Sequence, residues 1–351
     1  MTSLWERFKN QMMLKSIYKN EGAHLFLLLI WLFCFLIMFF PVRTGFHYWD
    51  ETVYLQHADI ILGGYDNYNE FDFRPPLFPI MLAIGNLFFN SLIMSHLIVA
   101  FIASLGVFGV FLLGKDLFNE KVGLISAIFY VFLPLNLILA HDLLVDTMLP
   151  VFLLFTTFFF IRAFKTEKTK YYIFGGTLFA LSILLKFTSL SFGLVFLLIY
   201  LVINGKKSLQ SVKRNYKKII LSIVTFLIVL LPYFIYSQIK YGFFFAAFIK
   251  GAIIINGDVY ISMFSILREF PKMIPFHIIG LTFLGLVIVL IRRKISRESL
   301  ILLICFITPF VLNFLVSHKE IRYFLPIVPF TVIFSSKVFY SMFLGWGKLI
   351  E

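Results

Sequence analysis

Residues 22–42 read GAHLFLLLIWLFCFLIMFFPV, an apolar run that contains no Asp, Glu, Lys or Arg. A helix needs about 17–25 such residues to cross the hydrocarbon core of a bilayer, so this run is long enough. Six further segments share the same lack of charge: 75–114, 122–141, 187–205, 219–239, 273–291 and 299–318. The pattern therefore predicts a protein that crosses the membrane many times.

The composition of the whole chain supports this interpretation. Hydrophobic residues make up 60% of the 351 residues and charged residues only 14%, whereas a soluble domain carries about 25% charge. A disordered chain is excluded because it would need far more polar residues. The two cysteines, Cys34 and Cys305, lie in separate apolar runs. We expect them to be small core residues, which form neither a disulfide nor a zinc site.

The distribution of basic residues predicts how the chain is oriented. We expect ten spans, at 24–42, 93–114, 122–141, 143–164, 171–187, 188–204, 218–237, 275–291, 299–316 and 323–343. With both termini in the cytoplasm, the cytoplasmic segments hold 21 of the 31 Lys and Arg, which is the asymmetry that orients membrane helices. Because the basic residues cluster in these short loops, we expect membrane lipids and no nucleic acid as partners.

The predicted fold class is therefore all-α, a polytopic membrane bundle of about ten transmembrane helices. We expect one domain over residues 1–351, without a separate C-terminal soluble domain. The first outside loop carries apolar residues at helical spacing from position 50 to 62, which predicts an amphipathic helix on the membrane surface. Asp50 would be its N-cap and Gly63 would end it. Asp50 is then either a reactive base or only a cap, and Glu51 either supports it or only complements the helix dipole.

Two cations lie on the same predicted face. Arg74 precedes Pro75 and Pro76, which hold it in a rigid extended turn. It either reaches lipid phosphates in general or binds one specific phosphate. Lys186 lies at the outside turn between the fifth and sixth spans. The segment 77–92 that follows Arg74 is apolar but too short to span, and we expect a re-entrant or interfacial helix there.

Acidic residues lie at the outside start of the fourth predicted span. Asp142 and Asp146 are four residues apart, so they share one face of a helix. Asp146 would lie about one turn below the surface, where a carboxylate is costly and usually functional. Metal binding by His141, Asp142 and Asp146 is one interpretation of this group. Helix capping explains the first two equally well.

A charged cluster also joins the last two spans on the outside. His318, Lys319, Glu320 and Arg322 lie within five residues, between apolar segments. Basic residues that orient membrane helices belong on the cytoplasmic side, so an orienting role explains this outside cluster poorly. A cationic pocket for a phosphate-bearing lipid fits it better.

Taken together, these motifs resemble the C-superfamily of membrane glycosyltransferases. The most similar pattern is that of glycosyltransferase family 39, which includes the protein O-mannosyltransferases and the lipid A aminoarabinose transferases. The resemblance covers roughly residues 24–343, and it rests on Trp49-Asp50-Glu51, Tyr54, Ala58, Gly63, Arg74-Pro75-Pro76-Leu77, Asp146 and Arg322-Tyr323-Phe324-Leu325-Pro326. The segment His318-Lys319-Glu320-Ile321-Arg322-Tyr323 is also similar to the His-Lys-Glu-x-Arg-Phe signature of dolichol-dependent mannosyltransferases.

This resemblance implies an enzyme of the cell membrane that uses a polyprenyl-phosphate-linked sugar donor. The acceptor would be a hydroxyl of a protein, lipid or glycan on the extracytoplasmic face, and one displacement would invert the anomeric carbon. The catalytic base maps onto Asp50, with Glu51 in support. The expected donor-phosphate ligands are Arg74, Lys186, Lys319 and Arg322. Further substrate contacts are expected from Tyr54, His141, Asp142, Asp146, His318, Glu320 and Tyr323.

No cofactor is certain from the sequence, and a divalent cation stays an open question. The rival interpretation is a transporter or flippase of a lipid-linked substrate, which also uses charged residues along its path. Such folds place charges near the middle of the membrane, between inverted repeats. Here the charges gather at one face, which favours an enzyme.

Overall fold

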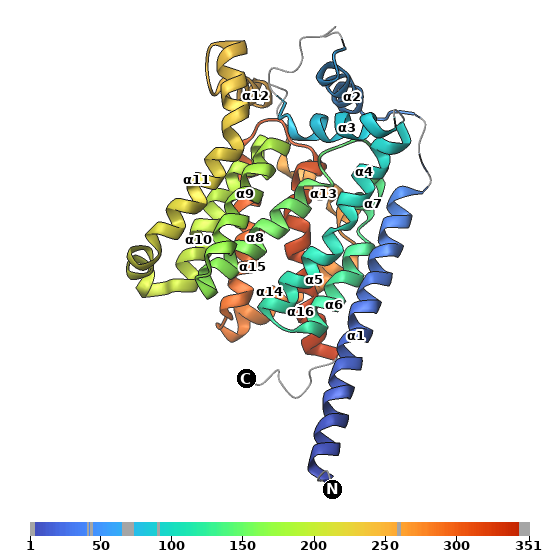
Figure 1. Cartoon of the computed structure of the whole chain (residues 1–351), viewed down its shortest axis with the longest axis vertical. Coiled ribbons are helices and arrows are strands. Elements are labelled where there is room, and N and C mark those ends of the chain that lie inside the picture. The colour runs from blue at the N-terminus through green and yellow to red at the C-terminus, as the bar shows by residue number, and fades with distance from the viewer. Residues whose placement is uncertain are drawn as a thin grey trace.

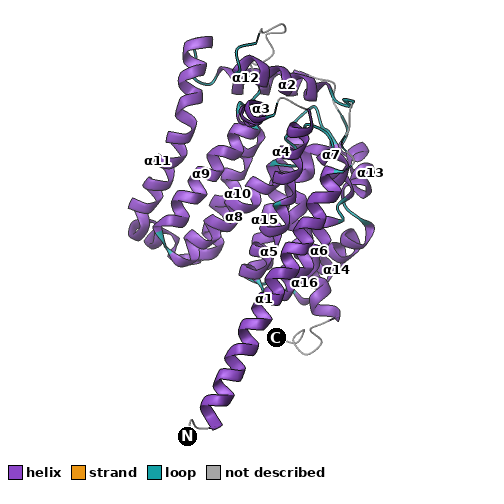
Figure 2. Cartoon of the chain, turned by 45° about the vertical axis from the view of Figure 1, so that its right-hand side comes forward, coloured by secondary structure: helices purple, strands orange, loops and turns teal. Residues whose placement is uncertain are grey.

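The described part of the chain is helical throughout. The structure, a computed structural model, describes residues 4–40, 42, 45–64, 74–89, 92–257 and 261–343. Every regular element in these ranges is an α-helix or a 3-10 helix (Figures 1 and 2). The predicted all-α class is therefore confirmed.

The helices follow one another with short connections. In the first part of the chain they are α1 (Leu4–Phe39), α2 (Trp49–Ile61), α3 (Leu77–Phe88), α4 (Leu92–Ser104), α5 (Gly106–Leu117), α6 (Glu120–Val131), α7 (Pro134–Ala140), α8 (Leu149–Thr166) and α9 (Thr169–Leu185). They continue as η2 (Phe187–Ser191), α10 (Phe192–Asn204), η3 (Gly205–Lys207), α11 (Ser208–Tyr241), α12 (Ala246–Gly257), α13 (Met263–Met273), α14 (Phe276–Arg292), α15 (Arg297–Leu312), η4 (Asn313–Leu315), η5 (Ile321–Ile327) and α16 (Val328–Phe343).

The number of membrane spans differs from the prediction. Five helical segments of the described chain are long and apolar enough to cross a membrane, and up to seven if each of two bent helix pairs counts as one span. One of these pairs, α6 with α7, is bent by 57°, and the other, α13 with α14, by 114°. Each of the ten predicted segments overlaps a helix or a helix pair, but the count of ten is not confirmed.

The first loop does form a helix, α2, with a start that differs from the prediction. It begins at Trp49, so Tyr48 takes the N-cap position and Asp50 is the second helical residue. The assignment of Asp50 as N-cap was wrong, because its carboxylate turns to long-range partners instead. Gly63 ends the helix as expected, with φ +97°, a conformation that L side chains rarely adopt.

The segment after Arg74 forms α3, which packs against α2 at one end of the bundle (Figure 1). With 12 residues it is shorter than a span. This agrees with the expectation that it does not cross the membrane by itself. The same end of the molecule carries α12, while α1 begins and α16 ends at the opposite end (Figure 1).

Small residues allow the central helices to pack closely. A Cβ atom added at Gly123 on α6 would lie 2.6 Å from the backbone oxygen of Phe111 on α5. Without a hydrophobic driving force between helices in lipid, such close contact supplies much of the packing energy. The helix α16 packs against α6, α14 and α15. Cys34 and Cys305 are fully buried free thiols, as predicted.

Candidate active site

Charged side chains from five separate segments meet near the end of the bundle that carries α2 and α3. The start of α2 contributes Asp50, and the turn before α3 contributes Arg74. Asp146 comes from the turn between α7 and α8, and Lys186 from the end of α9. Arg322 belongs to η5 and completes the group. We call these five residues together with Glu320 the charged cluster.

Asp50 lies between two arginines. Its Oδ1 accepts a hydrogen bond from Nη2 of Arg74 at 2.6 Å, and its Oδ2 lies 2.8 Å from Nη1 of Arg322. The side chain of Asp50 is 24% exposed, while both arginines are only 10% exposed. The carboxylate is thus partly accessible, while the two guanidinium groups that hold it are nearly buried. A group that is acidic, reachable and flanked by cations suits proton transfer next to an anionic substrate.

A second carboxylate holds the remaining cation. Oδ1 of Asp146 accepts a hydrogen bond from Nζ of Lys186 at 2.7 Å, and its Oδ2 lies 3.7 Å from Nη1 of Arg322. Asp146 is only 4% exposed, so its charge requires these partners. Asp146 therefore links Lys186 with Arg322 in the buried part of the site.

Glu320 fixes the orientation of Arg322. Its Oε2 accepts from Nε of Arg322 at 2.6 Å and its Oε1 from Nη2 at 3.0 Å, a bidentate pair. Oε1 also accepts from the hydroxyl of Tyr323 and lies within hydrogen-bond distance of the His318 ring. Burial opposes ionisation of Glu320, but the hydrogen bonds and charge of Arg322 outweigh it and lower the pKa of this carboxyl to about 2. Glu320 is therefore ionised at neutral pH.

Aromatic rings support the cations. The guanidinium carbon of Arg322 lies 5.0 Å from the ring centroid of Tyr48, and that of Arg74 lies 5.6 Å from the centroid of Tyr54. Nζ of Lys186 lies 4.3 Å from the centroid of Tyr323. These cation–π contacts limit the movement of the positive groups without neutralising them. Tyr54 and Tyr323 were predicted as substrate contacts. In the structure their rings contact the cations Arg74 and Lys186.

An apolar cavity adjoins the charged cluster. It has a volume of about 430 Å³ and is formed by the first turns of α8, by η2, by the end of α15 and by η5. Its walls are mainly apolar, with Leu149, Leu153, Leu190, Pro309, Leu312, Val316 and Pro326 among them. Tyr323 belongs to this wall and also contacts the charged cluster, since Nζ of Lys186 lies over its ring. The site thus combines an apolar cavity with a group of cations at one side of it.

The other predicted site residues have different surroundings. Glu51 is 1% exposed, and its carboxylate accepts backbone N–H groups of His47, Tyr48 and Leu143. It therefore holds the start of α2 against the turn after α7. Lys319 is 2% exposed and donates one hydrogen bond to the carbonyl oxygen of Val316, while its ammonium group carries three N–H donors in all.

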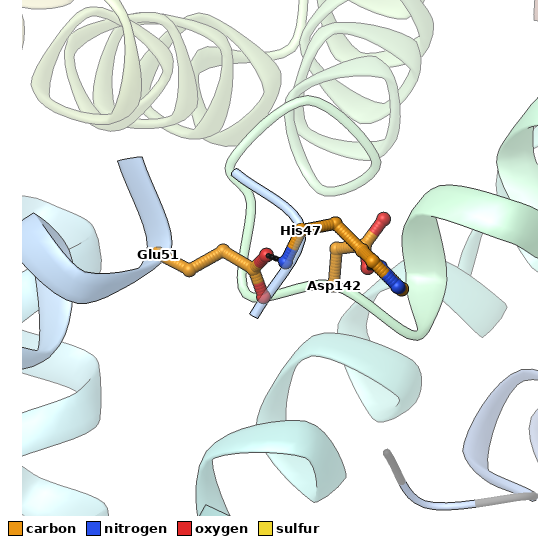
Figure 3. A group of neighbouring side chains, drawn as sticks. All are labelled: His47, Glu51 and Asp142. Carbon is orange, nitrogen blue, oxygen red and sulfur yellow. Dashed lines mark hydrogen bonds and ion pairs between the residues drawn. The ribbon is translucent and has the colours of Figure 1, made fainter. Parts of the chain in front are cut away.

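The predicted metal group is not assembled as expected. Both ring nitrogens of His141 lie within hydrogen-bond distance of carbonyl oxygens, those of Leu137 and Phe40. Asp146 is already engaged by two cations. Asp142 instead lies beside His47, whose Nδ1 is 2.9 Å from its Oδ1 (Figure 3). His47 was missed because a single histidine in an irregular loop follows no spacing pattern.

Two solved structures share the fold of this chain. It matches the structure of ArnT from Cupriavidus metallidurans bound to undecaprenyl phosphate with a TM-score of 0.74 at 18% sequence identity, over 91% of this chain. It also matches the archaeal oligosaccharyltransferase AglB from Archaeoglobus fulgidus, in complex with an inhibitory peptide and a dolichol phosphate, with a TM-score of 0.57 at 12% identity, over 92% of this chain. The chain therefore shares the fold of these two structures.

A family model also matches part of the sequence. Residues 73–236 match the family model of the dolichyl-phosphate-mannose-protein mannosyltransferases. Together with the fold, this match confirms the resemblance to C-superfamily, family-39-like glycosyltransferases that the motifs predicted. No curated protein matches the chain in sequence. The chain spans 60% of the length of the ArnT structure and 50% of the AglB structure.

Proposed function

We propose that this chain is a membrane glycosyltransferase that moves a sugar from a polyprenyl-phosphate donor to a hydroxyl of a protein, lipid or glycan acceptor. The observation that carries the proposal is the position of Asp50, held by Arg74 and Arg322 next to an apolar cavity. A base beside a phosphate-binding group is the arrangement that such a transfer requires.

The donor would use both parts of the site. Its isoprenoid chain is a pure hydrocarbon and suits the apolar cavity, since each buried CH₂ contributes about 0.8 kcal/mol. Its phosphate would lie beyond Tyr323, where Arg322, Arg74 and Lys186 supply three positive charges. Arginine is well suited to this task because its planar fork matches phosphate oxygens in a fixed geometry.

The phosphate would also change the state of the base. Without a donor, both oxygens of Asp50 are bound by arginines. A phosphate that competes for these guanidinium groups releases the carboxylate, which then accepts the proton of the acceptor hydroxyl. The acceptor oxygen forms its bond to the anomeric carbon as the bond from that carbon to the phosphate oxygen breaks. The electron pair leaves with the polyprenyl phosphate, and a single displacement of this kind inverts the anomeric centre.

The remaining residues of the site would position the reacting groups. Glu320 would orient Arg322, and Asp146 would hold Lys186, towards the donor phosphate. Glu51 fixes the first turn of α2, on which Asp50 sits. We further propose that this end of the bundle faces the extracytoplasmic side and that both termini are cytoplasmic, as the distribution of basic residues predicts.

The test is a transfer assay on the purified protein. A panel of labelled polyprenyl-phosphate sugars is incubated with the protein in detergent, and the release of lipid phosphate is measured. We expect release with at least one donor, and loss of it in Asp50→Asn. Asp59→Asn is the matched control, because Asp59 is an exposed aspartate of the same helix. Movement of the intact labelled lipid across a proteoliposome bilayer, without release of phosphate, would favour a flippase instead.

A further inference from the structure

A basic surface lies at the end of the bundle opposite the charged cluster. It is formed by the turn between α8 and α9 and by η3 with the first three turns of α11 (Figure 1). Residues 162–170 contain four Lys and Arg and residues 205–218 contain six, while Glu167 is the only acidic residue of these two segments. The proposed transfer reaction uses none of these side chains.

An ion pair joins the two segments into one surface. Arg214 of α11 pairs with Glu167, which follows the last residue of α8. Asp116 of α5 pairs with two cations of α8, since its oxygens lie 2.6 Å from Nε of Arg162 and 3.2 Å from Nζ of Lys165. Within the described chain, no carboxylate pairs with six other exposed lysines: Lys168, Lys170, Lys206, Lys207, Lys213 and Lys217. The surface therefore carries an excess of positive charge.

The first turns of α11 also expose an apolar stripe. Leu209, Val212 and Tyr216 follow helical spacing and are 69%, 39% and 51% exposed. On the other side of the same turns, Ser211 and Asn215 are buried, and α11 packs against α9 and α10. These turns are thus held against the bundle, and their apolar stripe faces away from it.

The stripe continues into the part of α11 that is apolar enough to cross a membrane. Ile220, Ile223 and Leu227 extend it, and all three are exposed. The 34 residues of α11 rise about 51 Å, whereas the hydrocarbon core of a bilayer is about 30 Å thick. The first turns therefore lie at the level of the lipid head groups. Lys213 and Lys217 lie beside the stripe, one turn apart, so their ammonium groups reach the level of the lipid phosphates.

We propose that this basic surface binds the head groups of anionic phospholipids in the adjacent leaflet. Excess positive charge favours anionic lipids over zwitterionic ones, and each Lys near a membrane surface strengthens binding about fivefold. The apolar stripe favours a lipid over a soluble anionic partner, because acyl chains are needed to cover it. The proposal stands on this charge and exposure and does not depend on the transfer reaction.

The experiment compares two lipids on the same protein. The purified full chain in a neutral detergent is titrated with phosphatidylglycerol or with phosphatidylcholine of the same chain length, and bound lipid is measured by native mass spectrometry. We expect phosphatidylglycerol to bind more tightly by about fivefold or more, with a smaller difference at high ionic strength. Lys213→Gln combined with Lys217→Gln should weaken phosphatidylglycerol binding by about 25-fold and leave phosphatidylcholine binding unchanged. Both lysines are exposed, so a folded variant is expected.

Two control variants locate the bound lipid. Arg293→Gln combined with Lys294→Gln removes the same charge from the exposed connection between α14 and α15 and should keep the preference for phosphatidylglycerol. Arg322→Ala removes a cation of the charged cluster at the opposite end and should keep it too. Equal affinity of the unmodified chain for both lipids would overturn the proposal. An unchanged preference in the double lysine variant, or an equal loss in either control, would overturn it as well.

Discussion

Replacing Asp50 by Asn should move turnover and donor affinity in opposite directions. The carboxylate occupies both arginines that the proposed donor phosphate needs, at 2.6 Å from Arg74 and 2.8 Å from Arg322. Asn keeps the size of the side chain but cannot accept the acceptor proton. Turnover should therefore fall about a hundredfold or more, the usual contribution of a general base. The donor should bind more tightly, since a competing negative charge has been removed.

The size of the second effect follows from the contacts. A hydrogen bond to a charged group contributes about 1.5–3 kcal/mol and a neutral one about 1 kcal/mol. The amide side chain of the variant still offers a neutral acceptor, so each arginine contact weakens by about 0.5–2 kcal/mol. If one such difference appears in donor binding, affinity rises by about 2- to 30-fold. A helix cap without a role in the site would produce no such gain.

The assay combines equilibrium binding of a labelled polyprenyl phosphate with single-turnover measurement of sugar transfer. Asp59→Asn serves as the control and should change neither quantity. The reasoning is refuted if Asp50→Asn keeps near-normal turnover, because Asp50 would then not be the base. It is also refuted if the variant binds donor more weakly, because the carboxylate would then not compete with the phosphate.

Other consequences are equally open to measurement. Arg322→Ala should weaken donor binding by about 10- to 150-fold, and Arg322→Lys should retain part of it; a defect seen only in the acceptor saturation curve would assign Arg322 to the other substrate. The pKa of Glu320 is lowered to about 2, so its contribution to stability is complete above about pH 4.5 and is lost as the pH falls towards 2. The melting temperatures of wild type and Glu320→Gln should therefore differ at pH 7 and converge near pH 2, and a constant difference would contradict this. Leu190→Glu places a charge in the wall of the apolar cavity and should impair long-chain donors more than short-chain analogues. Single cysteines at Gly64 and Ser208 should differ on intact cells, with only the first reacting with an impermeant thiol reagent; labelling of the second would reverse the orientation.

Much of the site could be predicted from the sequence because of a simple geometric fact. When apolar runs alternate direction through a membrane, charged residues of alternate loops must gather at the same end. Asp50, Arg74, Asp146, Lys186 and Arg322 were all assigned to that end, and the structure brings them into one network. Their individual roles stay predictions.

The partners of these residues could not be predicted in the same way. Asp50 near a helix start fits an N-cap by local pattern, but two arginines from distant segments attract its carboxylate more strongly than a backbone N–H does. Lys319 and Arg322 are close in the sequence, yet one donates to a carbonyl and the other joins the network. The count of ten spans is not confirmed because hydropathy does not fix the length or continuity of helices: α9 has only 17 residues, and the predicted spans 188–204 and 218–237 lie within one helical stretch, Phe187–Tyr241.

The balance of charge in the cluster has a kinetic consequence. Three cations, Arg74, Lys186 and Arg322, face three carboxylates, Asp50, Asp146 and Glu320. In the proposed reaction the donor is a phosphodiester with one negative charge, while the spent lipid is a phosphomonoester with a charge of about −1.5 to −2 at neutral pH. The same cations therefore hold the spent lipid more tightly than the donor. Its departure becomes the slow step, so the first turnover should appear as a burst and added polyprenyl phosphate should act as a product inhibitor.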